Sequence, residues 1–195
     1  MPLSPPSQRE HLHTRTVECR GFRRADGLWD IEGHIVDTKT YGFDNEWRGR
    51  VEPGQPVHDM WIRLTLDDEF TITDVEAKTD HSPYQICGDI APAYRKLLGI
   101  KVAPGFTRKT RELFGGTHGC THLMELLGPV ATTAFQTIFT ARSRYPRKEA
   151  PAEEKEKGVA AGQKRRSRLI DTCHALAATS PVVKRFWPDF YTGPK

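Results

Sequence analysis

Several enzyme signatures are missing from this sequence of 195 residues. It has no G-x-G-x-x-G fingerprint, no Walker loop and no G-x-S-x-G elbow, so dinucleotide, nucleoside-triphosphate and α/β-hydrolase chemistry have no support. None of the four cysteines forms a C-x-x-C pair, which removes the zinc-ribbon and thioredoxin motifs. No apolar run approaches the ~18 residues of a membrane span, and the first residues have no apolar signal-peptide core. We therefore expect a cytoplasmic protein without a membrane partner.

The net charge of +4 is unevenly distributed along the chain. Residues 142–195 carry 13 Lys and Arg against 6 Asp and Glu, whereas residues 1–141 carry 16 against 19. A protein that binds nucleic-acid phosphates along a groove should carry its positive charge on the folded part of the chain, here residues 1–141. We therefore expect no nucleic-acid partner.

Residues 14–80 have the texture of β-structure. Asp26-Gly27 is a strong hairpin signal. Short turns between consecutive strands favour an antiparallel meander over a βαβ layout. We predict four strands, at Thr14–Arg24, Leu28–Tyr41, Val57–Leu66 and Phe70–Thr79, with a loop over 42–56.

Residues 83–145 have a helical texture. We predict helices at Pro92–Leu98, Thr107–Phe114 and His118–Arg142, the last with a kink or a new start at Gly128-Pro129. Residues 146–164 are typical of a linker, Lys164–Thr179 of a last helix, and 186–191 of an aromatic tail that could form the contact of a homodimer. The predicted fold is α+β: an arm at 1–13, then one domain over 14–195 with a sheet of about four strands packed on a central uncharged helix.

The start of the predicted helix at His118 holds candidate chemical groups. At about 100° per residue, His118, His122 and Glu125 share one face, and Cys120 points away from it. Two imidazoles and a carboxylate could hold a divalent metal such as zinc. They could equally perform acid–base catalysis without a metal, or only cap and hydrogen-bond nearby loops.

The stretch Leu126–Ala141 contains no charged residue, which indicates a buried helix. Four polar residues continue the angular stripe of His118 and His122: Thr132, Thr133, Gln136 and Thr140. Such a stripe could be the wall of a pocket, or it could form hydrogen bonds between helices.

Two predicted strands also carry candidates. Along Leu28–Tyr41, the apolar face that begins at Trp29 continues as Asp37, Lys39 and Tyr41. This change suggests the mouth of a cavity, where lysine and tyrosine could bind an anionic or phenolic group, although a strand end in solvent gives the same pattern. His58 shares its face with Met60 and Ile62, so it is either a core histidine or a catalyst, and Arg23 is the arginine of the first strand best placed to reach inward.

Several of these segments resemble a bacterial family catalogued as domain of unknown function 2889. The matching pieces are Arg24-Ala25-Asp26-Gly27-Leu28-Trp29-Asp30-Ile31-Glu32, Asp37-Thr38-Lys39, His58-Asp59-Met60, Arg63-Leu64-Thr65 and Gly119-Cys120-Thr121-His122-Leu123-Met124-Glu125-Leu126, within residues 10–141. The resemblance implies a role in the bacterial breakdown of lignin-derived aromatic compounds. Such pathways include the cofactor-free removal of a hydroxymethyl carbon as formaldehyde, through a quinone-methide-like intermediate.

The leading hypothesis is a cofactor-free carbon–carbon lyase of the deformylation type that acts on a small aromatic substrate by acid–base catalysis. The catalytic candidates are Lys39, Tyr41, His58, His118 and His122, and the substrate-binding candidates are Asp37, Arg23, Glu125, Gln136 and Trp29. One alternative is a metal-dependent hydrolase or lyase that uses His118, His122 and Glu125. Another is a non-enzymatic binding or assembly module. We expect the site between the sheet and the N-terminal half of the His118–Arg142 helix.

Overall fold

The computed structural model describes residues 4–141, 144–145, 166–167 and 169–194. The chain divides into two compact units, Met1–Arg147 and Lys148–Lys195, and each is described by itself. The single domain over 14–195 stays a prediction, because compactness does not test whether the two units fold together.

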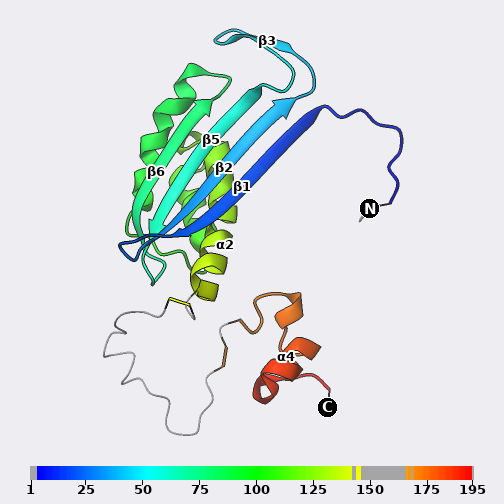
Figure 1. Cartoon of the computed structure of the whole chain (residues 1–195), viewed down its shortest axis with the longest axis vertical. Helices are drawn as coiled ribbons and strands as arrows, with labels where there is room; N and C mark the ends of the chain where they lie inside the picture. Colours follow the sequence, from blue (N-terminus) through cyan, green and yellow to red (C-terminus); the bar gives the residue numbers. More distant parts are fainter. Residues whose placement is uncertain (1–3, 142–143, 146–165, 168, 195) are drawn as a thin grey trace. The chain divides into compact units, whose positions relative to one another are not determined.

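The first unit is built on a four-stranded antiparallel sheet, as predicted (Figure 1). Its strands follow the order β1-β2-β5-β6, and neighbours in the sheet are also neighbours in sequence, apart from the β3–β4 insertion. The strands are β1 (His13–Arg23), β2 (Trp29–Lys39), β5 (Pro56–Leu66) and β6 (Ile72–His81). The α+β fold class is therefore confirmed.

The β1–β2 connection forms at the predicted turn. Gly27 has a φ of 94°, a conformation that glycine adopts without strain, and the Asp26 carboxylate accepts the Leu28 N–H. This turn fixes an uninterrupted register from His13 opposite Lys39 to Arg23 opposite Trp29.

The segment over 42–56 is more ordered than a loop. It contains a small hairpin of β3 (Phe43–Asn45) and β4 (Gly49–Val51), which form a separate two-stranded sheet. The loop prediction is therefore wrong for these six residues, because two three-residue strands are too short to show a period in the sequence.

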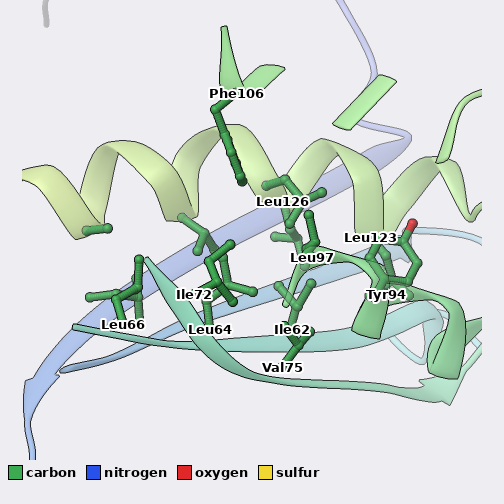
Figure 2. Close-up of a cluster of buried hydrophobic side chains, with 14 of the residues drawn as sticks. Ile62, Leu64, Leu66, Ile72, Val75, Tyr94, Leu97, Phe106, Leu123 and Leu126 are labelled. Carbon is green, nitrogen blue, oxygen red and sulfur yellow. The ribbon is translucent and has the colours of Figure 1, made fainter. Parts of the chain in front are cut away.

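The helical part covers one face of the sheet (Figure 1). Along β2, buried and half-buried residues alternate, and the buried face packs against the longest helix. Leu123 and Leu126 of that helix meet Ile62 and Leu64 of β5 in the core, together with Tyr94, Leu97 and Phe106 (Figure 2). The helices are η1 (Gln85–Leu97, a 3₁₀ segment), α1 (Phe106–Phe114), η2 (Gly116–His118) and α2 (Thr121–Ala141).

Helix α2 differs from the prediction in three ways. It begins at Thr121 and not at His118, and it continues through Pro129 without a new start. Its Leu126–Ala141 stretch is buried on one face only, and Thr132, Gln136 and Thr140 are exposed. The absence of charge therefore did not mean burial on all sides.

The second unit is small. It contains η3 (His174–Leu176), α4 (Pro181–Phe186) and η4 (Pro188–Phe190). The helix predicted over Lys164–Thr179 is wrong for the described residues from 169 onward, where only turns and η3 occur. The predicted linker at 146–164 lies outside the described residues. Across the described ranges, no helix combines the length and apolarity needed to traverse a bilayer.

Candidate active site at the Asp37 cluster

Asp37 is the centre of a polar cluster at the end of the buried sheet face. Its side chain is 1% exposed, and both carboxylate oxygens accept hydrogen bonds. Arg15 donates from Nε to Oδ1 at 2.8 Å and from Nη2 to Oδ2 at 2.9 Å. The Nε2 atom of His13 lies 3.0 Å from Oδ1, and Nδ1 of His58 lies 3.0 Å from Oδ2. The carboxylate thus has four hydrogen-bond contacts, which come from three residues.

Strand register brings these groups together. Arg15 on β1 and His58 on β5 both lie directly opposite Asp37 on β2. The β2–β5 register shifts beside this position, where Val57 has no opposite residue because Thr38 pairs with Pro56. A bulge of this kind redirects the adjacent side chain and is common near functional sites. Here the adjacent side chain is that of His58.

The N-terminal turn of α2 adds His122 and Glu125. The Nε2 atom of His122 lies 3.6 Å from Asp37 Oδ2, and its ring stacks on that of His58 with centroids 3.8 Å apart. Glu125 forms an ion pair with the outer side of the Arg15 guanidinium. The cluster therefore joins three strands and one helix.

Tyr94 holds this end of α2 in place. Its hydroxyl donates to the Cys120 carbonyl at 2.8 Å and accepts the Cys120 N–H at 3.2 Å. The ring of Tyr94 is fully buried and stacks on Phe114. Because Cys120 immediately precedes α2, this double hydrogen bond fixes the height of His122 above the sheet.

Charge in the cluster is unequally distributed. Burial alone would raise the pKa of Asp37, but the hydrogen bonds and charge of Arg15 outweigh it and lower that pKa to about 2. Burial lowers the pKa of both His58 and His122, and the His122 and Arg15 charges act in the same direction on His58. Near neutral pH, Asp37 is therefore ionised beside two neutral imidazoles.

This charge state assigns the His58 tautomer. An ionised carboxylate only accepts hydrogen bonds, so Nδ1 of His58 carries the proton that faces Asp37. The Nε2 atom of the neutral ring is then an acceptor that can take a proton. Asp37 and His58 form the pair in which a carboxylate orients a histidine base.

The cluster also has ligand types for a metal ion. Within the described ranges, Asp37, His58 and His122 are the His, Cys, Asp or Glu residues that offer one ligand atom each within 4.8 Å of one another. Neutral imidazoles and an ionised carboxylate are the forms that bind a metal. Arg15, however, already occupies both oxygens of Asp37.

Four of the ten predicted site residues meet in this cluster: Asp37, His58, His122 and Glu125. Lys39 and Tyr41 lie beside it, since Lys39 is opposite His13 in the β1–β2 register. The Nζ atom of Lys39 donates to the Tyr41 hydroxyl at 2.9 Å and lies 4.9 Å from the centre of its ring.

His118 does not join the cluster. It ends η2, is exposed, and lies before an extended Gly119 with φ −157° and ψ −179°. A side chain at Gly119 would lie 2.6 Å from the Phe114 carbonyl oxygen, so the chain is pressed close here and does not continue as a helix. The single helical face of His118, His122 and Glu125, and the metal site predicted on it, are therefore absent.

Three other candidates lie elsewhere. Trp29 begins β2, eight residues from Asp37, and its indole N–H donates to Asp68 at 2.8 Å. Arg23 is half-buried, and its guanidinium lies over the Trp29 ring at 4.6 Å from the ring centre. Gln136 is exposed and lies about 20 Å along α2 from His122 at 1.5 Å per residue.

A hollow of about 430 Å³ lies away from the cluster, between β6 and η1. Val75, Ala91 and Arg95 are in its lining, which contains none of the predicted site residues. His58 and His122 instead reach the surface, with side chains 18% and 21% exposed.

Sequence reasoning missed Arg15 and His13. His13 lies at the end of the predicted arm, and the sequence singles out Arg23 as the inward-reaching arginine of the first strand and leaves Arg15 as a candidate for ordinary charge pairing. The hairpin signal at Asp26-Gly27 could have found both, because counting outward from that turn places Arg15 opposite Asp37 and His13 opposite Lys39.

A family model described as Protein of unknown function (DUF2889) matches residues 13–136, which is more than half of the chain. The chain belongs to the DUF2889 family. The match spans β1 to α2, so this DUF2889 chain has every member of the Asp37 cluster inside the matched region. No curated protein and no solved structure matches the chain.

Proposed function

We propose that this protein is a cofactor-free lyase that removes a hydroxymethyl carbon from a small lignin-derived aromatic compound as formaldehyde. The observation that supports an acid–base mechanism is the 3.0 Å contact between the buried Asp37 carboxylate and His58 Nδ1. The substrate class comes from the family resemblance.

In this proposal His58 Nε2 is the general base. It takes the proton of the substrate hydroxymethyl group, the oxygen forms the carbonyl of formaldehyde, and the carbon–carbon bond breaks. The electron pair of that bond enters a quinone methide, which becomes a phenolate with a side-chain double bond. The quinone methide forms in a preceding step, when the phenolate expels a benzylic oxygen that takes its proton from solvent water, since His122 is neutral near pH 7. Asp37 stabilises the imidazolium that His58 becomes.

Lys39 and Tyr41 are suited to the phenolate end of the substrate. Among the described residues Lys39 forms no ion pair with a carboxylate, and its Nζ atom donates to the Tyr41 hydroxyl. Lys39 lies on the same face of β2 as Asp37, two residues further along. The two residues are therefore about 7 Å apart along the strand. An ammonium and a phenol at that distance could hold an aromatic oxygen while His58 acts on the side chain.

The test measures formaldehyde release from lignin-derived aromatic dimers that carry a hydroxymethyl group. We expect His58→Gln to lower kcat about 10²- to 10⁴-fold, the usual range for a lost general base. His118→Gln is the matched control, because His118 is exposed and outside the cluster. No formaldehyde from the unchanged protein would reject the lyase and favour the binding module, and full activity of His58→Gln would reject the base.

A second candidate is a metal-dependent lyase or hydrolase centred on Asp37, His58 and His122. Two ligands of a tetrahedral zinc lie about 3.3 Å apart, and Asp37 Oδ2 lies 3.0 Å from His58 Nδ1 and 3.6 Å from His122 Nε2. Arg15 would have to release one oxygen of Asp37 to the ion. Stoichiometric metal in the purified protein, with activity lost to a chelator, would establish this candidate over the first. Full activity of the metal-free protein would reject it.

The cysteines agree with the cytoplasmic location that we propose. Cys19, Cys87, Cys120 and Cys173 are all free thiols in the structure. Unpaired cysteines are usual in a reducing compartment.

A further inference from the structure

The two edges of the four-stranded sheet are treated differently. At the β6 edge, two residues that follow η1 pair with Ile72 of β6. The Gly99 N–H donates to the Ile72 carbonyl at 2.8 Å, and the Ile72 N–H donates to the Ile100 carbonyl at 2.9 Å. At the opposite edge, β1 pairs with β2 alone in the described structure. Residues 14–23 make no other backbone hydrogen bond there. The outer N–H and C=O groups of β1 are therefore open to another strand.

Strand β1 lacks the usual protection of an exposed edge. Edge strands are commonly short, bulged or interrupted by proline. β1 has 11 residues, no proline and an unbroken register with β2. Val17 and Phe22 are exposed along it. The charges on its outer sheet face are one Glu18 and one Arg20.

C-terminal to Glu125, which pairs with Arg15, the layer above β1 is uncharged. Thr133 of α2 lies at the Cys19 thiol, and Thr137 is so close to Gly21 that a side chain there would overlap it. The flank of α2 on this side carries Pro129, Thr132, Gln136 and Thr140, which are all exposed. Thr132, Gln136 and Thr140 belong to the polar stripe predicted from the sequence, and they lie toward the free edge, C-terminal to the part of α2 that meets the Asp37 cluster.

We propose that the chain forms a two-fold dimer in which β1 pairs antiparallel with β1 of a second copy, with Cys19 opposite Cys19. The two sheets then become one sheet of eight strands, twice the four of one copy. An isologous contact of this kind closes after two copies and removes both free edges. The proposal is independent of the proposed function.

The charges on the outer face of β1 favour this register. Side chains of directly opposite residues in an antiparallel pair point to the same face of the sheet. In a two-fold pair of β1 strands, one residue must therefore lie opposite its own copy, and the axis passes between these two copies. With Cys19 on the axis, Glu18 of each copy, which also pairs with Arg20 of its own strand, faces Arg20 of the other copy on the outer sheet face. On the inner face Arg15 of each copy faces Arg23 of the other, and Arg15 is already paired there with two carboxylates of its own copy. With Glu18 or Arg20 on the axis, like charges would face each other.

The helices are also compatible with this arrangement. Because Thr137 lies on Gly21 of β1 and Val130 on Gly33 of β2, α2 runs above the boundary between these strands. That boundary is one strand spacing from the axis, so the two α2 helices would lie about 10 Å apart. This matches the usual separation of packed helices, about 8–10 Å. Their uncharged flanks would then face each other.

The test is the mass of the full chain in solution, with charge reversals in β1. We expect the unchanged protein to be a dimer, and Glu18→Arg or Arg20→Glu alone to raise the dimer dissociation constant at least about tenfold. The double variant Glu18→Arg with Arg20→Glu restores the opposite charges and should restore the dimer. The control Glu112→Arg changes the same charge on α1 and should remain dimeric.

Three results would overturn the proposal: a monomer at tens of micromolar, dimers that survive both single reversals, or a double variant that stays monomeric although its circular dichroism is that of the unchanged protein. Oxidation with diamide provides a second readout, because Cα atoms of opposite residues lie within the range that a disulfide spans. We expect a covalent dimer that Cys173→Ser keeps and Cys19→Ser abolishes. A covalent dimer that persists in Cys19→Ser would contradict the register.

Discussion

Replacing Asp37 by Asn tests whether the charge of this carboxylate, and not only its shape, organises the cluster. Asn keeps the size of the side chain but removes the negative charge that Arg15 and His58 face. The side chain is 1% exposed, so solvent screens these interactions little.

The magnitude follows from the pKa of Asp37. The carboxyl group has a pKa of about 2 in the folded protein and an ordinary value of 3.8. The free energy equivalent to that difference is about 2 kcal/mol of stability at pH 7. Because the folded pKa is the lower one, this stabilisation is complete above pH 3.8 and is lost as the pH falls through about 2. Near pH 3 about half of it remains.

Urea unfolding of both proteins at pH 7 and pH 3 measures this effect. We expect Asp37→Asn to lower the free energy of unfolding by about 2 kcal/mol at pH 7 and by about half as much at pH 3. The quantity to compare is the difference in unfolding free energy between the two proteins at each pH. His58 and His122 also have lowered pKa values, so their protonation destabilises both proteins as the pH falls below about 6.5.

The matched control is Asp59→Asn. Asp59 lies on the other face of the same sheet, is 19% exposed and pairs with His34 instead of an arginine. We expect it to cost less than about 1 kcal/mol. An Asp37→Asn protein as stable as the unchanged one at pH 7, or equally destabilised at both pH values, would refute the reasoning.

Two further substitutions test how α2 is positioned. Gly33→Ala should lower the free energy of unfolding in urea by about 1–3 kcal/mol, because its new Cβ would lie 2.5 Å from a methyl group of Val130. Gly128→Ala should not destabilise the protein, because a Cβ atom at Gly128 would have no atom of the described residues outside its own helix within 4 Å. Equal effects of the two substitutions would contradict the close packing of α2 on β2. Tyr94→Phe removes both hydrogen bonds to Cys120, so it should cost about 1–3 kcal/mol and speed amide hydrogen exchange in the first turn of α2. Unchanged exchange at that turn would contradict the role of Tyr94.

The sheet could be predicted well because its signals are local. Asp26-Gly27 marks a turn, and the period-two pattern from Trp29 to Asp37 marks a strand with one buried face. The start of helix α2 was harder to predict from the sequence. Gly119 takes an extended conformation because the chain is pressed against Phe114, and that contact is invisible in a helical pattern that extends over His118.

Part of the candidate site could also be predicted. Asp37, His58 and His122 were each selected for residue type and for position on a face. Their partners were less accessible, because Arg15 looks like any surface arginine until the β1–β2 register places it opposite Asp37. Trp29 and Gln136 were selected on the correct elements, but at the wrong ends of them.

The sequence by itself determined the strands, their faces and the residue types available for chemistry, since turn preference and side-chain alternation act over a few residues. Only the tertiary structure decided which groups meet. Asp37 is 21 residues from His58 and 85 from His122, so their contact depends on strand register, on the Val57 bulge and on the clamp of Tyr94 at α2. Local sequence pattern carries no information on these two contacts. The same holds for the uncharged stripe of α2, which only the fold places over the free edge of β1.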